Sequence, residues 1–150
     1  MPQITIPGKP FGKQRPKIAR RRGFNQAMTP DETVNYEVMI KLLSIKAGAI
    51  PIDGPIRMGV AAYFKPPKSA SKKKREGMLC HKILPTVKPD FDNIAKIVAD
   101  GLKHLFDDKQ VVTCVTYKRY SEIDRVVVMW SHHDDKREFH EFISDLATTV

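Results

Sequence analysis

The chain has 150 residues and a formal net charge of +9, from 26 Lys and Arg against 17 Asp and Glu. That length is typical of one domain and can bury a core without disulfides or structural metals. No apolar run approaches the ~18 residues of a membrane helix, the N-terminus lacks a signal-peptide pattern, and two cysteines make no disulfide framework, so we expect a cytoplasmic protein without membrane contact.

The N-terminal half of the chain predicts two strands and one helix. Residues 3–6 alternate between polar and apolar side chains, as in a short strand. A basic loop follows, and Thr29 and Glu32 then form a capping box that opens a helix over 30–47. Its apolar positions at helical spacing are Val34, Val38, Leu42 and Ile45. Unbroken alternation over 56–64 predicts the second strand.

The C-terminal half predicts a basic stretch, two helices and two further strands. A short helix can follow Ser69 or Ser71, and a longer one is expected over 92–105. The apolar stripe of this longer helix is Ile94, Ile97, Val98, Leu102 and Leu105. Residues 111–117 and 125–130 predict two strands joined as a hairpin, and a last helix is expected near 135–147. The order predicts an α/β (α+β) fold, a single domain over 1–150 with helices packed on a small mixed sheet.

Basic side chains gather in two segments that exclude acids. Residues 1–30 contain no Asp or Glu, and neither does the stretch 65–75. Lys and Arg that neutralise phosphates release counterions, so both segments predict DNA-backbone contacts, although they can also be solvated surface loops. The predicted DNA contacts are Lys13, Arg15, Lys17, Arg20, Arg21, Arg22, Lys68, Lys72, Lys73, Lys74 and Arg75.

Carboxylates gather around the predicted helix at 92–105. Asp90 and Asp92 stand at its start, Lys96 follows one turn later, and Asp108 lies beyond its end. A phosphodiester is anionic, and a divalent cation that offsets this charge and activates a water makes its hydrolysis feasible. Mg²⁺ takes oxygen ligands and keeps several waters, so two or three aspartates suffice. The simpler interpretation is a helix cap at Asp90 or Asp92 and a surface pair between Asp92 and Lys96.

Three segments in this region carry a family resemblance. They are Lys88-Pro89-Asp90-Phe91-Asp92-Asn93-Ile94-Ala95-Lys96, then Asp100-Gly101-Leu102, then Asp107-Asp108-Lys109-Gln110-Val111. Their order and composition resemble the RusA family of Holliday junction resolvases. The resemblance implies a Mg²⁺-dependent endodeoxyribonuclease that cleaves branched DNA, such as a four-way junction, as a two-fold homodimer. It also implies that Asp90, Asp92 and Asp108 hold the metal and that Lys96 joins them as a catalytic residue.

The length of the predicted helix bears on how such a site is assembled. A helix over 92–105 is ~21 Å long, whereas two ligands of one Mg²⁺ lie within roughly 4–5 Å of each other. Either the helix ends early and the chain doubles back, or each site takes Asp108 from the partner subunit. The second arrangement is the one we expect, because two-fold dimers are common and provide two equivalent sites.

Two other functions remain open on this sequence. A basic accessory protein that binds branched DNA without cutting it would account for the two basic segments alone. A nuclease that acts mainly on flaps or forks would use the same carboxylates. Phe91, next to these acids, is expected either to contact DNA or to pack internally, whereas Trp130 lies in an apolar strand and is expected in the core.

Overall fold

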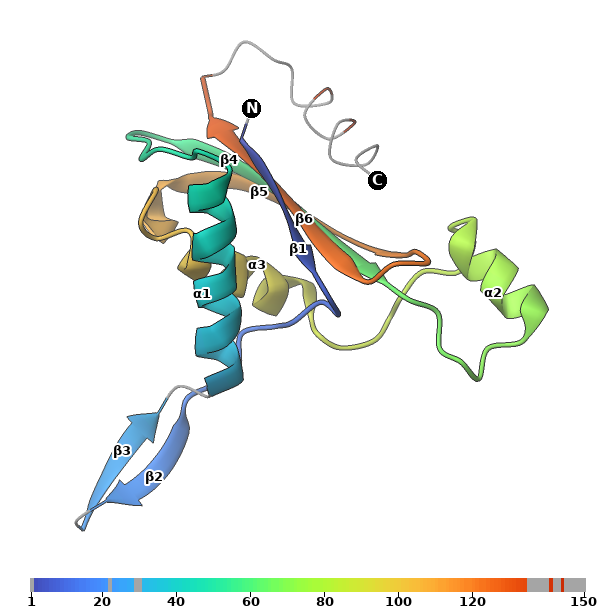
Figure 1. Cartoon of the computed structure of the whole chain (residues 1–150), viewed down its shortest axis with the longest axis horizontal. Helices are drawn as coiled ribbons and strands as arrows, with labels where there is room; N and C mark the ends of the chain where they lie inside the picture. The colour runs from blue at the N-terminus through green and yellow to red at the C-terminus, as the bar shows by residue number, and fades with distance from the viewer. Residues whose placement is uncertain (1, 22, 29–30, 135–140, 142–143, 145–150) are drawn as a thin grey trace.

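The computed structural model of the chain describes residues 2–21, 23–28, 31–134, 141 and 144 (Figure 1). In chain order, the elements are β1 (Gln3–Pro7), β2 (Lys17–Arg21), β3 (Phe24–Met28), α1 (Asp31–Lys46), β4 (Ile56–Phe64), α2 (Lys72–Leu79), α3 (Phe91–Gly101), the short 3₁₀ helix η1 (Asp108–Gln110), β5 (Val111–Tyr120) and β6 (Arg125–His132). Among these residues, no helix is long and apolar enough to cross a membrane.

A mixed four-stranded sheet in the order β1-β6-β4-β5 forms the body of the molecule. β4 pairs antiparallel with β6 and parallel with β5, and β1 pairs antiparallel with β6. The predicted hairpin between 111–117 and 125–130 is wrong, because β4 lies between β5 and β6. All nine residues of β4 are buried, and a strand that is buried on both faces belongs at the centre of a sheet. The predicted α+β class with a mixed sheet is confirmed.

Helices α1 and α3 cover one face of this sheet (Figure 1). The predicted apolar stripe of α3 is in the core, with exposed fractions from 0 to 4%. Trp130 is also fully buried in this core, as its strand predicted. Helix α1 agrees with its predicted range, but its buried face consists of other residues, namely Thr33, Tyr36, Ile40 and Ser44.

The predicted apolar stripe of α1 faces outward instead. Val34, Val38, Leu42 and Ile45 are between 42% and 60% exposed. Buried Thr33 and Ser44 occupy the core side of the helix, and Ser44 is satisfied there by hydrogen bonds with the Lys41 carbonyl and His104. An apolar stripe that no other described part of the chain buries therefore runs along the outer side of α1.

The N-terminal basic segment forms a ribbon rather than the predicted loop. Strands β2 and β3 pair antiparallel, and the ribbon projects away from the body beside the start of α1 (Figure 1). Arg22 lies outside the described residues, and the side chains of Lys17, Arg20 and Arg21 are not described either. The helix predicted near 135–147 also lies outside the described residues, apart from positions 141 and 144.

Candidate active site

Helix α3 ends four residues earlier than predicted, at Gly101. Leu102 and Leu105 remain in the core, but they lie in turns that reverse the chain before η1, and the Leu105 amide donates to the Leu102 carbonyl at 2.9 Å. This reversal places Asp108 beside the middle of α3, where the Lys96 ammonium forms an ion pair with Asp108 Oδ2.

This contact removes the reason for expecting a site shared between subunits. The argument for an Asp108 from the partner subunit required a straight helix over 92–105, and α3 does not have that length. The chain instead doubles back, so that Asp108 meets Lys96 of its own chain. The expectation of a composite site was therefore based on a wrong helix boundary.

A second carboxylate, Asp100, holds the other side of the Lys96 ammonium. Its side chain is only 6% exposed, and Oδ1 lies 3.1 Å from Lys96 Nζ while Oδ2 lies 2.9 Å from Lys13 Nζ. Lys103 Nζ lies 3.5 Å from Oδ1. Burial alone would raise the pKa of Asp100, but the hydrogen bonds from Lys13 and Lys96 hold it below its usual range. Asp100 therefore stays charged, and the Lys96 ammonium lies between the carboxylates of Asp100 and Asp108.

The same ion pairs perturb the two lysines. The hydrogen bond to Asp108 raises the pKa of Lys96, against the effect of its partial burial. Burial would lower the pKa of Lys13, but its hydrogen bonds to Glu37 and Asp100 outweigh that effect and raise it. Both ammonium groups are therefore charged at neutral pH.

Lys13 lies inside this network and is not among the freely exposed cations. Its ammonium is bonded to Glu37 of α1 and Asp100 of α3, and its backbone amide donates to the Asn93 carbonyl at 2.9 Å. At Gly12, a Cβ would lie 2.6 Å from the Pro89 side chain, so only glycine lets this segment approach the start of α3 so closely. Lys13 therefore supports the start of α3, and its predicted role as a DNA contact stays a prediction.

Hydrogen bonds of Asp107 and Gln110 fix the segment around Asp108, just before β5. Gln110 accepts a hydrogen bond from the Asp107 amide at 2.7 Å, and the Asp107 carboxylate caps the turn by accepting from the Lys109 amide. Gln110 Nε2 also donates to the carbonyls of Ile52 and Gly54. Asp107 and Gln110 thus have structural roles, and they fix the turn from which Asp108 reaches Lys96.

Asp90 and Asp92 stand at the start of α3 with exposed side chains. Asp90 occupies the N-cap position, but its side chain makes no capping hydrogen bond, so the simpler interpretation as a helix cap does not hold for it. The surface pair between Asp92 and Lys96 is absent as well, since Lys96 turns to Asp100 and Asp108. Phe91 is 64% exposed, which excludes the alternative that it packs internally.

The donor atoms near α3 match the preferences of Mg²⁺, although they are not gathered into a cage. Asp108 Oδ1 is buried without a hydrogen-bond partner among the described residues, so this oxygen is available to a cation. Within that same part of the chain, no three His, Cys, Asp or Glu side chains come together as ligands. Mg²⁺ keeps several waters and is usually bound by one or two protein carboxylates, and Asp90, Asp92 and Asp108 are the carboxylates here that could hold it.

Of the other predicted DNA contacts, the structure brings one group together. Ser71, one of the two predicted helix starts, caps α2. Lys72, Lys73 and Lys74 are exposed in the first turn of this helix. Lys68 and Arg15 are exposed too, and Arg75 is half-buried. Among the described side chains, the exposed cations Arg15, Lys68, Lys72, Lys73 and Lys74 form no ion pair with Asp100 or Asp108, the partners of Lys96.

Sequence reasoning missed Glu37 and gave Asp100 no role, although Asp100 belongs to one of the segments that carry the family resemblance. Asp100 stands four residues after Lys96, the spacing of an i,i+4 ion pair, so its contact with Lys96 was accessible from the sequence. Glu37 comes from another helix, and nothing in its local sequence indicates that it meets Lys13.

Comparison with known proteins agrees with this geometry. The family model described as "Endodeoxyribonuclease RusA" matches residues 7–130. This range includes α3, η1 and the ion-paired residues Lys13, Glu37, Lys96, Asp100 and Asp108. "Uncharacterized protein YqaN" of Bacillus subtilis (strain 168) is 37% identical over 132 residues, which cover 85% of this chain and 93% of that protein. The chain therefore belongs to the RusA endodeoxyribonuclease family.

Proposed function

We propose that this protein is a Mg²⁺-dependent endodeoxyribonuclease that resolves four-way DNA junctions by paired, symmetric nicks, acting as a homodimer in the cytoplasm. Family membership supports the class of reaction. The observation that carries the proposal further is the position of Lys96, whose ammonium is held between Asp100 and Asp108 on the outer side of α3. A fixed cation beside an unsatisfied carboxylate oxygen is suited to phosphoryl chemistry.

Each residue of the site has a distinct role in this proposal. Asp108, Asp90 and Asp92 would hold Mg²⁺, which when bound offsets the charge of the phosphodiester and lowers the pKa of a water nucleophile. Lys96 places its positive charge where negative charge develops on the phosphate. Asp100 is a positioning residue, because its buried carboxylate keeps the Lys96 side chain extended toward Asp108.

The basic segments support the proposed DNA substrate. Helix α2 and the β2–β3 ribbon lie on opposite sides of α3 (Figure 1). The first turn of α2 carries three exposed lysines and no acid. Positive charge is unfavourable near a helix N-terminus, and phosphate bound there relieves that cost. A junction has DNA arms on each side of the branch, which fits cations on each side of the site.

The outer side of α1 supports the proposed homodimer. The stripe of Val34, Val38, Leu42 and Ile45 is apolar, at least 42% exposed and continuous along one helix. A two-fold axis across such a stripe pairs it with itself, because an isologous interface uses the same surface on both subunits. The occupant we assign to it is a second copy of this chain.

Nicking of a synthetic four-way junction tests the proposal. We expect cleavage with Mg²⁺ and none with EDTA, and we expect Asp90→Asn, Asp92→Asn and Asp108→Asn each to reduce the rate by at least about 100-fold while junction binding persists. Asp53→Asn, at an exposed site outside the network, is the matched control and should cleave normally. Normal cleavage by Asp108→Asn, or cleavage of flaps but not junctions, would contradict the proposal.

A subunit-mixing experiment tests the arrangement of the site within one chain. Asp92→Asn protein is mixed with Asp108→Asn protein under conditions that let subunits exchange. Because Lys96 and Asp108 meet within one chain, no site in a mixed dimer is intact, and nicking should stay absent. Recovery of single-strand nicking would instead show that two chains share a site.

A further inference from the structure

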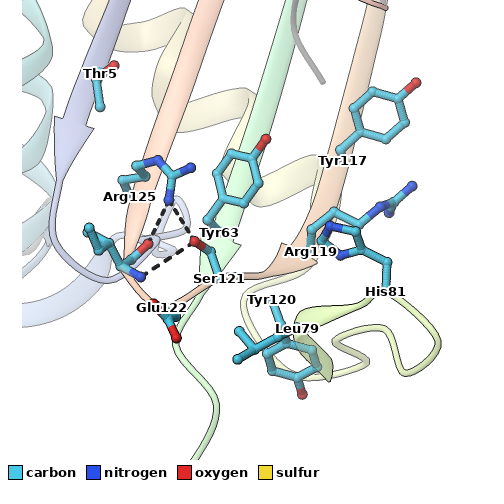
Figure 2. A pocket seen from close by; sticks show the side chains of 11 residues that line it. Thr5, Tyr63, Leu79, His81, Tyr117, Arg119, Tyr120, Ser121, Glu122 and Arg125 are labelled. Carbon is cyan, nitrogen blue, oxygen red and sulfur yellow. Dashed lines mark hydrogen bonds between the residues drawn. The ribbon is translucent and has the colours of Figure 1, made fainter. Parts of the chain in front are cut away.

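A pocket of about 810 Å³ opens at the end of the sheet where β4 and β5 finish (Figure 2). Side chains alternate across a strand, so the pocket lies on the face opposite α1 and α3. Its wall combines tyrosines with cations, and its main lining residues are Thr5, Tyr63, His81, Tyr117, Arg119 and Arg125. This volume is in the range of ligand-binding pockets.

The register of the sheet sets the floor of this pocket. Tyr63 of β4 pairs directly with Arg125 of β6 on one side and with Arg119 of β5 on the other. In the next row, Ala61 pairs with Tyr117. Ala61 is buried in a small cluster with Tyr63, and Tyr117 packs against this cluster. Both tyrosine rings project from the sheet in Figure 2. The floor is therefore an alternating pattern of tyrosine and arginine.

The two arginines are held in place by neighbouring groups. The Arg125 guanidinium lies 4.1 Å from the centre of the Tyr63 ring and donates to Ser121 Oγ at 2.9 Å. The Arg119 guanidinium lies 4.9 Å from the centre of the Tyr117 ring. Side chains fixed in this way bind a ligand with little further loss of conformational freedom.

The charge around the pocket favours an anionic ligand. Among the described residues that line it, Glu122 is the one acid, against two arginines and His81. Leu79 is the last residue of α2, and His81 follows it two positions later. The pocket therefore begins where the basic helix ends. The exposed lysines of α2 stand in the first turn of the same helix, at its other end.

We propose that this pocket binds an unpaired nucleotide of the DNA strand beside the branch point. The base stacks on the half-buried Tyr117, and the phosphate contacts Arg119, because proteins recognise exposed bases by stacking on aromatic rings and arginine planes. This inference rests on the proposed function, since it presumes a branched DNA substrate.

The pocket and the candidate active site share one edge of the sheet. The ammonium of Lys118, next to Arg119 on β5, donates to the Val87 carbonyl, three residues before Asp90. The start of α3 thus lies near one face of the sheet at the end of β5, and the pocket lies on the opposite face at the same end. A strand that passes around this edge reaches both, which places the captured nucleotide close to the scissile phosphate.

Photocrosslinking identifies what the pocket holds. A four-way junction with one unpaired 5-iodouracil at the branch is mixed with the full chain in EDTA and irradiated, and the crosslinked peptides are mapped by mass spectrometry. We expect a crosslink at Tyr117. Crosslinks at Phe91 alone, or in the β2–β3 ribbon alone, would overturn the proposal.

Variants of Tyr117 give the matching binding measurement. Tyr117→Leu removes a half-buried ring and should weaken binding to the junction that carries an unpaired nucleotide about tenfold. Tyr117→Phe keeps the ring and should bind this junction normally. Val112→Ala, on an exposed part of the same strand, is the control. Equal binding by Tyr117→Leu, or displacement of the crosslink by a glutamate-rich peptide, would overturn the assignment to DNA. If the wild type crosslinks at Tyr117 but nicks no branched DNA, only the proposed nuclease function fails.

Discussion

Asp100 gathers three lysines around one buried carboxylate at the centre of the molecule's charged network. Removing its charge while keeping its shape should release Lys96 from one of its two partners. We expect Asp100→Asn to lower kcat for junction nicking roughly 10- to 100-fold, since small misplacements of a catalytic group have effects of that order. KM and metal-free junction affinity should change little, because the exposed cations that we propose as DNA contacts are untouched.

Glu37→Gln is the matched control for Asp100→Asn. It removes one carboxylate from Lys13 but makes no contact with Lys96, so its kcat should be close to that of the wild type. A purely structural effect of Asp100 would show in stability, which urea unfolding measures against pH. Since the folded-state pKa of Asp100 is lowered, its stabilisation is present above the ordinary value of 3.8 and is lost as pH falls through the lower folded value. Equal kcat losses in both variants would contradict the positioning role.

Much of the residue-level chemistry was accessible from the sequence, and the rest depended on tertiary contacts. Asp90, Asp92, Lys96 and Asp108 stand out because their types and spacing fit metal-assisted hydrolysis, and their roles stay predictions. The partnership of Lys13 with Glu37 and Asp100 was not accessible, because these residues come from three separate segments. A cation in an acid-free segment looks like a DNA contact until its internal partners are known.

At the scale of elements, the packing of α1 on α3 depends on one glycine. A Cβ at Gly101 would lie 2.7 Å from Ile40 Cβ, an atom that cannot move without the backbone of α1. We expect Gly101→Ala to lower the free energy of unfolding by about 1–3 kcal/mol, as overpacking does. Urea denaturation of the purified protein measures this change.

Gly77 in the middle of α2 provides the control for Gly101. A Cβ there would meet only the flexible end of Ile83, at 2.9 Å, and alanine is the better helix former by about 1 kcal/mol. Gly77→Ala should therefore be neutral or stabilising. A loss of stability equal to that of Gly101→Ala would show that the contact with Ile40 is not the cause.

The first turn of α2 makes a separate prediction. Replacing Lys72, Lys73 and Lys74 by Ala should weaken binding to junctions, flaps and duplexes alike and reduce the salt slope by about 1 per lysine that contacts a phosphate. The melting temperature should not fall, because these charges oppose the helix dipole. Affinity and salt slope are measured by titration at several salt concentrations, and an unchanged slope would exclude α2 from the DNA interface.

At the level of elements, the sequence predicted the presence of the main helices, but not the end of α3 or the order of the strands. Helices α1 and α3 were recognisable because long apolar patterns recur at helical spacing. The end of α3 was misplaced, since Leu102 and Leu105 keep that spacing while lying in turns. The position of β4 between β5 and β6 is a long-range pairing, and local alternation carries no information about which strands are neighbours.

At the scale of the whole molecule, the outer stripe of α1 determines the expected assembly. Leu42→Glu places a charge in the middle of the stripe and should convert the proposed dimer to a monomer in sedimentation experiments, because an isologous interface receives the charge twice. Val112→Glu adds the same charge at an exposed apolar site on β5. Dissociation of the Val112 variant alone would move the interface to the edge of the sheet.

The place of β6 in the sheet has a consequence for the timing of synthesis. β1 and β4 are not neighbours, and each pairs with β6, which spans Arg125–His132. A growing chain emerges from the ribosome N-terminal end first. The sheet beneath α3 therefore stays incomplete while the aspartates of the candidate site are already outside the ribosome. The nuclease acquires its supported site only after nearly the whole described chain has been made, so nascent chains present carboxylates and cations without the scaffold that aligns them.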